Sequence, residues 1–235
     1  MTPKFHFLFF SILATILIFA CQSNPFEGPQ TETKIPTSKT TQIKPSKNEQ
    51  KQALLGFIIK KNTNSTARYI VNEQLVKLPA PNNAVGSTKE IKGKIILSEN
   101  GQISPDHNSY LEVNMLSLKS DSSRRDNYLK SKSLESNIYP TALFQITKIN
   151  NLPFPTPQNQ KLDFELIGIL TIRNVSKEVT WNVSSEFDGT KLTGIANTQF
   201  NFGFFEIEIP KVFVVVSVKD LIQLEIDFEA IKINQ

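Results

Sequence analysis

Histidine is the residue type most often used for proton transfer and metal binding, and the chain has only two histidines. His6 lies in an N-terminal apolar segment, and His107 lies in the turn-like stretch 104–108. A structural zinc site needs about four ligands, mainly His and Cys. Because the chain also has one cysteine only, we expect no metal site and interpret His107 as a solvated loop residue.

Nucleophilic catalysis and phosphate binding have no sequence signature here either. No serine sits between the glycines of a nucleophile elbow, and no Gly-rich phosphate loop occurs among the nine glycines. Several acidic residues alternate with apolar residues, as on the solvated outer face of a strand: Asp163, Glu165, Glu225, Asp227 and Glu229. We therefore predict that the protein has no catalytic residues and is not an enzyme.

The side chains best suited to binding are large and apolar, and they share one face of alternating segments. Trp181 is the only tryptophan and the central member of this set. Such a face either fills a core or lines an apolar cavity, where many dispersion contacts supply affinity without specific hydrogen bonds. Both interpretations stay open. The cavity-lining candidates are Phe144, Phe164, Leu170, Trp181, Val183, Phe200, Leu224 and Phe228.

Arg125 is the one charged residue with a candidate binding role. It lies in a turn-rich connector that ends at Tyr139-Pro140, where a new alternating segment begins. Its planar fork of donors could bind an anionic or quinone-like head group at the mouth of a cavity. The alternative is a structural pair with Asp126 or a backbone carbonyl group.

Period-two alternation dominates the chain after about residue 90 and predicts seven or eight antiparallel strands. Asp188-Gly189 between two alternating runs is a strong hairpin signal. Helical periodicity is scarce. It predicts a helix at Arg68–Leu78 and a short helical turn or two within Ser122–Ser136. Such a set of strands is typical of a barrel or sandwich. The predicted strands are Glu90–Leu97, Ser109–Ser117, Ala142–Ile149, Leu162–Ile172, Glu178–Phe187, Leu192–Phe200, Val212–Val218 and Leu221–Ile233.

The N-terminal part of the chain predicts export and a membrane anchor. Phe5–Phe19 is almost wholly apolar but shorter than the roughly 20 residues of a membrane span, as in a signal peptide. Leu17-Ile18-Phe19-Ala20-Cys21 resembles a bacterial lipobox, so we expect acylation, such as palmitoylation, at Cys21; the alternative is an ordinary signal peptide or an uncleaved anchor. The polar segment that follows has the composition of a flexible tether. We predict a signal peptide at 1–20, a tether at 21–52 and one folded domain at 53–235.

Two signatures within the folded part resemble those of the YceI-like family of lipid- and polyisoprenoid-binding proteins. The first is Arg125-Asp126 with Leu129 and Leu134, then Tyr139-Pro140-Thr141-Ala142 and Phe144. The second is the stretch from Gly168 to Thr180, in which Asn174 replaces the usual glycine of a hairpin turn. We expect Asn174 to be tolerated, because asparagine enters left-handed conformations readily. Weaker similarity to sequence patterns of this family occurs at Ile91–Leu97 and Phe200–Gly203, so the resemblance covers about 68–230.

The resemblance implies an all-β fold, an eight-stranded antiparallel lipocalin-like barrel with one or two short helices. It also implies an isoprenoid, quinone or fatty-acyl lipid in the barrel and frequent pairing as homodimers. The near-neutral folded part lacks the basic footprint of a nucleic-acid-binding protein. We expect an envelope lipoprotein, lipid-anchored to a bacterial membrane. The alternative is a surface-exposed interaction lipoprotein with a filled barrel, whose outer face near Ile167, Ile169 and Val212–Val218 meets another chain.

Overall fold

The computed structural model describes residues 54–60 and 64–234. The predicted signal peptide and the whole predicted tether, including Cys21, therefore lie outside the described residues. The strands are β1 (Leu55–Ile59), β2 (Thr66–Leu75), β3 (Asn82–Thr88), β4 (Ile91–Leu97), β5 (Tyr110–Asn114), β6 (Lys119–Ser120), β7 (Thr141–Asn150), β8 (Lys161–Ile172), β9 (Val175–Phe187), β10 (Lys191–Phe200) and β11 (Val215–Asn234). The helical elements are η1 (Met115–Ser117), α1 (Ser123–Tyr128), η2 (Leu129–Ser133) and η3 (Phe202–Phe205).

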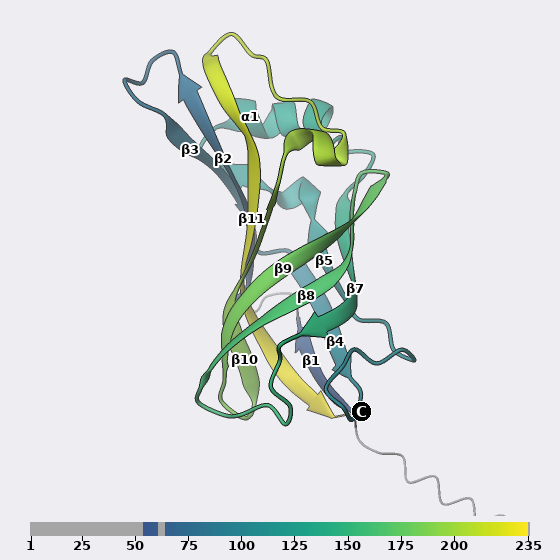
Figure 1. The fold of residues 1–235 in the computed structure, drawn as a ribbon. Coiled ribbons are helices and arrows are strands. Elements are labelled where there is room, and N and C mark those ends of the chain that lie inside the picture. Colours follow the sequence, from purple (N-terminus) through teal and green to yellow (C-terminus); the bar gives the residue numbers. More distant parts are fainter. Residues whose placement is uncertain (1–53, 61–63, 235) are drawn as a thin grey trace, which may run out of the picture. The chain divides into compact units, whose positions relative to one another are not determined.

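Eight of the strands close into a barrel (Figure 1). Hydrogen-bonded neighbours follow the order β1, β4, β5, β7, β8, β9, β10 and β11, and β1 pairs with β11 to complete the ring. All these pairings are antiparallel. The prediction of an eight-stranded antiparallel barrel is confirmed.

The long strand β11 joins the barrel to a flared extension. One edge of β11 pairs with β10 from Ile222 to Ile231. The other edge pairs with β1 near Ile231–Asn234 and with β2 from Val215 to Asp227. Strand β3 then pairs with β2, and the short β6 with β3. In Figure 1 the ends of β2, β3 and β11 project beyond the ring, at the end opposite to β1.

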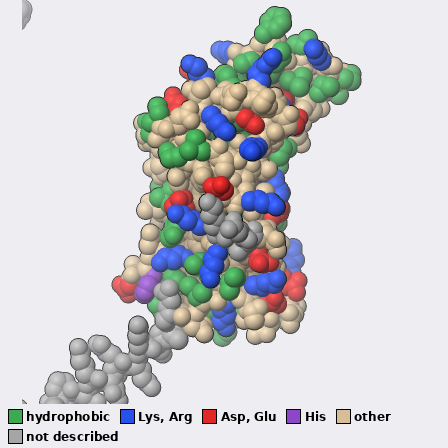
Figure 2. All heavy atoms as spheres, turned by 180° about the vertical axis from the view of Figure 1, so that it is seen from behind, with side chains coloured by type: hydrophobic (Ala, Val, Ile, Leu, Met, Phe, Trp, Pro, Cys, Tyr) green, Lys and Arg blue, Asp and Glu red, His purple; other side chains and the backbone are tan. Residues whose placement is uncertain are grey.

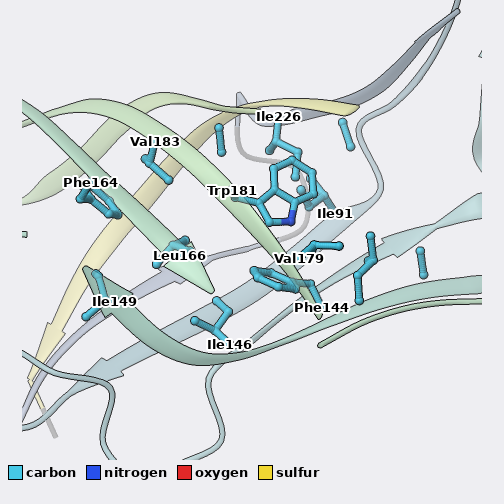
Figure 3. Close-up of a cluster of buried hydrophobic side chains, with 14 of the residues drawn as sticks. Ile91, Phe144, Ile146, Ile149, Phe164, Leu166, Val179, Trp181, Val183 and Ile226 are labelled. Carbon is cyan, nitrogen blue, oxygen red and sulfur yellow. The ribbon is translucent and has the colours of Figure 1, made fainter. Parts of the chain in front are cut away.

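The barrel forms because its strands alternate apolar and polar side chains. Along β9, Val179, Trp181, Val183 and Phe187 are buried, whereas the residues between them are mostly exposed. Strand β8 has the same pattern from Leu162 to Ile172. Because successive side chains point to opposite faces of a strand, the buried sets meet inside the barrel (Figure 3). Ile167 and Ile169 lie on the outer face and are partly exposed.

Three predictions of secondary structure were wrong or incomplete. The segment predicted as a helix at Arg68–Leu78 forms strand β2, whose aromatic and β-branched residues at 69–71 favour extended backbone. Val212–Val218 and Leu221–Ile233 are not two strands, because a single strand runs from Val215 to Asn234. Strands β1, β3 and β6 had no counterpart in the prediction.

The two predicted turns also have different outcomes. The Asp188-Gly189 hairpin is confirmed, and Gly189 has a positive φ of 97°. In the turn between β8 and β9, the left-handed residue is Arg173 (φ 56°) and not Asn174. The Arg173 guanidinium donates to the carbonyl oxygens of Phe205 (3.3 Å) and Glu206 (2.6 Å), and these bonds hold it in place.

The connector between β6 and β7 contains α1, the one α-helix among residues 54–60 and 64–234, which continues into η2. The Ser122 side chain caps this helix by accepting a hydrogen bond from the Arg125 backbone N–H (3.3 Å). The helical turn expected within Ser122–Ser136 is therefore confirmed. No helix in the described part of the chain is long and apolar enough to cross a membrane.

Candidate ligand-binding site

A cavity of about 430 Å³ occupies the half of the barrel nearest α1, called here the upper cavity. Strand residues from β2, β5 and β7 to β11 form its walls, and α1, η2 and the loop 206–214 complete them. The volume lies within the range of about 300–1,000 Å³ that is typical of small-molecule sites. Its apolar walls include Leu111, Val113, Phe144, Leu170, Ile172, Trp181, Phe200, Ile207, Val215, Ile222 and Leu224.

Phe144 and Trp181 separate this cavity from a smaller one. Both residues line the upper cavity and also a lower cavity of about 70 Å³. Their ring centroids are 6.0 Å apart, with the planes tilted by 46°, and the two rings lie beside each other in Figure 3. The lower half of the barrel is thus almost filled by side chains, and the upper half is not.

Trp181 carries the only unpaired polar atom in this dividing layer. Its indole N–H is buried and has no hydrogen-bond partner among the described residues. A buried donor without an acceptor costs about 1–3 kcal/mol. The ring therefore occupies this position because of its apolar contacts and not because of a hydrogen bond.

The structure divides the predicted cavity-lining residues into two groups. Phe144, Leu170, Trp181, Phe200 and Leu224 line the upper cavity. Phe164, Val183 and Phe228 line only the lower one, which is too small for more than a few atoms. The sequence places all eight on one face, and which of them border open space follows from the packing across the barrel.

Arg125 lies at the wall of the upper cavity, where two carboxylates already hold it. Its guanidinium forms an ion pair of 2.5 Å with Glu73 and another with Asp121. Burial would lower the pKa of Arg125, but the hydrogen bonds to Asp121 and Glu73 raise it overall. Asp126 instead accepts hydrogen bonds from the backbone N–H (2.9 Å) and hydroxyl (2.7 Å) of Ser120.

Strand β2 supplies a wall of the cavity that sequence reasoning missed. Tyr69, Val71, Glu73 and Leu75 line the cavity from alternate positions. The Tyr69 ring lies over Gly86 of β3, where any side chain would overlap it, and burial raises the pKa of the Tyr69 hydroxyl to about 12. This alternation was the available signal, and the helical interpretation of Arg68–Leu78 concealed it.

The arrangement is suited to binding an apolar chain. No group of three or more His, Cys, Asp or Glu residues capable of holding a metal occurs among the described residues. His107 is outside the cavity, where its Nδ1 shares a hydrogen bond of 3.0 Å with the Ser104 hydroxyl. The polar groups at the cavity wall that involve Arg125 are paired with one another.

The YceI-like domain model matches residues 61–230. The chain belongs to the YceI-like family. Both signatures of YceI-like proteins lie on this site: Tyr139-Pro140 leads into β7, and the stretch from Gly168 forms the hairpin of β8 and β9. Gly168 faces β7 so closely that a Cβ atom would overlap the Gln145 carbonyl oxygen.

Solved structures of low sequence identity share the YceI-like fold. A polyisoprenoid binding domain from Saccharophagus degradans, implicated in plant cell wall breakdown, has a TM-score of 0.55 and 8% identity, covering 77% of this chain and 98% of that chain. BcnA of Burkholderia cenocepacia has a TM-score of 0.51 and 15% identity, covering 71% and 95%. The Campylobacter jejuni YCEI protein has a TM-score of 0.51 and 20% identity, covering 66% and 89%. A search of curated protein sequences gives no match.

Proposed function

We propose that this YceI-like protein is an envelope lipoprotein that holds the chain of an isoprenoid, quinone or fatty-acyl lipid in the upper cavity, without catalysis. The observation that carries the proposal is the open, apolar upper half of the barrel above the Phe144–Trp181 layer. Apolar walls remove a hydrocarbon chain from water, at about 0.8 kcal/mol per CH₂ group. The polyisoprenoid binding domain with the same fold supports this ligand class.

Arg125 has a specific place in this function. Its ion pairs with Glu73 and Asp121 leave no full positive charge free for a ligand. Asp121 is the more exposed of the two partners, so an anionic head group at the cavity mouth would exchange with it more easily than with Glu73. Arg125 then both orders the wall and offers a donor to a head group.

The anchor in this proposal is an acyl group on Cys21, the only cysteine of the chain. Replacing Cys21 by serine should abolish partitioning of the protein into the membrane phase of its bacterial host. Unchanged partitioning of Cys21→Ser would contradict the anchor and leave the ligand proposal in place. Fractionation of the same cells identifies the membrane.

Native mass spectrometry and lipid extraction of protein purified from its host test the ligand. We expect a lipid in stoichiometric amount that is reduced in a Trp181→Ala variant, because Trp181 borders the open cavity. Repeated absence of lipid, with Trp181→Ala folded and equally competent, would favour the alternative of an interaction lipoprotein. In that case the partner would be another chain on the outer face.

A further inference from the structure

Two segments that are far apart in the sequence form an exposed apolar surface where β2, β3 and β11 project. One is the end of β2 with its turn to β3, and the other is the approach to β11. The backbone N–H of Val76 donates to the carbonyl oxygen of Val214 (3.1 Å), which fixes the two segments side by side. The apolar tip, as we name it, comprises the exposed side chains Val76, Leu78, Phe213, Val214 and Val216.

The exposure of this tip is unusual for such residues. Phe213 is 99% exposed, Val216 65% and Val76 61%. Single exposed apolar residues are common, but a contiguous group of them marks an interaction surface. These three side chains do not line the upper cavity, so binding inside the barrel does not account for them.

The charges within the two segments that carry the tip are all positive, and the nearest acidic residues in the chain, Glu73, Glu208 and Asp220, lie just outside these segments. Residues 74–84 and 209–219 contain three lysines, Lys77, Lys211 and Lys219, and no acidic residue. Figure 2 shows hydrophobic and basic side chains together at this end of the molecule. Apolar side chains flanked by lysines are typical of proteins that insert partly into the interfacial region of a membrane with anionic lipids.

The tip is also continuous with the upper cavity. Pro210, Val212, Val214, Val215 and Val218 line that cavity from the same segment that carries Phe213 and Val216. Leu75, next to Val76, lines it as well. One surface of this segment therefore faces the cavity and the other faces outward, so a lipid chain could pass between a bilayer and the cavity along apolar side chains.

We infer that the apolar tip docks the barrel onto the surface of an anionic lipid bilayer, with Phe213, Val216 and Val76 inserted and the three lysines against head groups. This docking is separate from the proposed anchor at Cys21. The 32 residues between Cys21 and Leu54 could extend about 100 Å. The 20-residue strand β11 is about 65 Å long, so such an anchor permits the far end of the barrel to reach the same membrane.

Site-specific fluorescence on vesicles tests the docking. The chain from residue 22 onward keeps every described residue and lacks both the apolar leader and Cys21, so Phe213→Cys becomes its only labelling site. With vesicles of phosphatidylcholine and phosphatidylglycerol, we expect an environment-sensitive label at residue 213 to shift to the blue. The same label at Gln160→Cys, exposed just before β8 at the opposite end of the barrel, should not shift.

Matched substitutions measure the apolar and electrostatic contributions. Phe213→Asp should weaken vesicle binding at least about tenfold, from the loss of one buried aromatic side chain. Ile138→Asp places the same charge at an apolar residue that is 70% exposed but outside the tip, and should have no effect. Replacing Lys77, Lys211 and Lys219 by glutamine should weaken binding to anionic vesicles about fivefold per lysine. Neutral vesicles should show little of this loss.

Several results would overturn the inference. These are no vesicle binding, equal blue shifts at residues 213 and 160, or equal effects of Phe213→Asp and Ile138→Asp. Self-association that Phe213→Asp abolishes and vesicles do not displace would assign the tip to a second copy of the chain instead. Phe213→Asp should still co-purify with lipid, because its side chain does not line the cavity. Failure of the cavity proposal and failure of the docking inference are therefore distinguishable.

Discussion

Ala142 offers a way to occupy part of the upper cavity without disturbing the rest of the barrel. It is buried on β7 and lines the upper cavity but not the lower one. Leucine adds three carbon atoms, whose burial is worth at most about 2.4 kcal/mol. Local repacking offsets much of this gain. We expect the free energy of unfolding of lipid-free Ala142→Leu to stay within about 1 kcal/mol of the parent protein, as measured by urea titration.

The same three carbons take space that a lipid chain would use. A loss of about 2 kcal/mol in binding corresponds to a dissociation constant about thirtyfold higher. Titration with dansyl-labelled farnesol measures this, with energy transfer from Trp181 as the signal. Because Trp181 is the only tryptophan and borders the cavity, it reports occupancy of the upper cavity directly.

Ala196→Leu is the matched control, since Ala196 lines only the lower cavity of about 70 Å³. Overpacking there should lower the free energy of unfolding by about 1–3 kcal/mol and leave the dissociation constant within about threefold. If Ala142→Leu binds the farnesol probe as tightly as the parent protein, the upper cavity is not the binding site. A loss of stability in Ala142→Leu as large as in Ala196→Leu would show that the upper half has no spare volume.

Three further substitutions test the wall and the turns of the barrel. Arg125→Leu should lower the free energy of unfolding by about 3 kcal/mol in urea titration, because it leaves the carboxylate of Glu73, 8% exposed, buried and unpaired. Adding Glu73→Gln to this variant should recover most of the lost stability. If the double variant recovers none of it, the pairing of Arg125 with Glu73 is contradicted. Gly168→Ala should cost about 2–3 kcal/mol by overlap with the backbone of β7, whereas Gly203→Ala, with open space around it, should be nearly neutral. Backbone hydrogen bonds within its own turn lower the pKa of Asp188 from 3.8 to about 2, so its charged form stabilises the fold above pH 3.8 and this contribution is lost as the pH falls through about 2. The thermal midpoint of Asp188→Asn should therefore lie below that of the parent protein at pH 5 and converge with it near pH 2; a gap that persists at pH 2 would rule out titration of this carboxylate as the cause.

Local alternation in the chain was enough for a barrel or sandwich of antiparallel strands, and the resemblance to the YceI-like family selected the barrel. The alternation along Leu162–Ile172 and Glu178–Phe187 has a period of two, which places the apolar side chains on one face of each strand. Asp188-Gly189 predicted its hairpin because the turn residues themselves favour that conformation. Strand β2 escaped the prediction because a charged residue, Glu73, lies on its inner face. Its partner Arg125 is 52 residues away, so no local signal marks the pair.

The division of the barrel into a filled half and an open half is a property of the folded molecule. Phe144, Phe164, Trp181 and Phe228 have the same pattern in the sequence, yet only the first and third border the upper cavity. Cavity volume depends on which side chains meet across the ring, and those contacts join strands that are distant in the chain. The apolar tip likewise depends on contacts between distant parts of the chain, since Val76 and Phe213 become neighbours only when β2 pairs with β11. Alternation thus established one apolar face on each strand, and tertiary packing decided where that face borders open space.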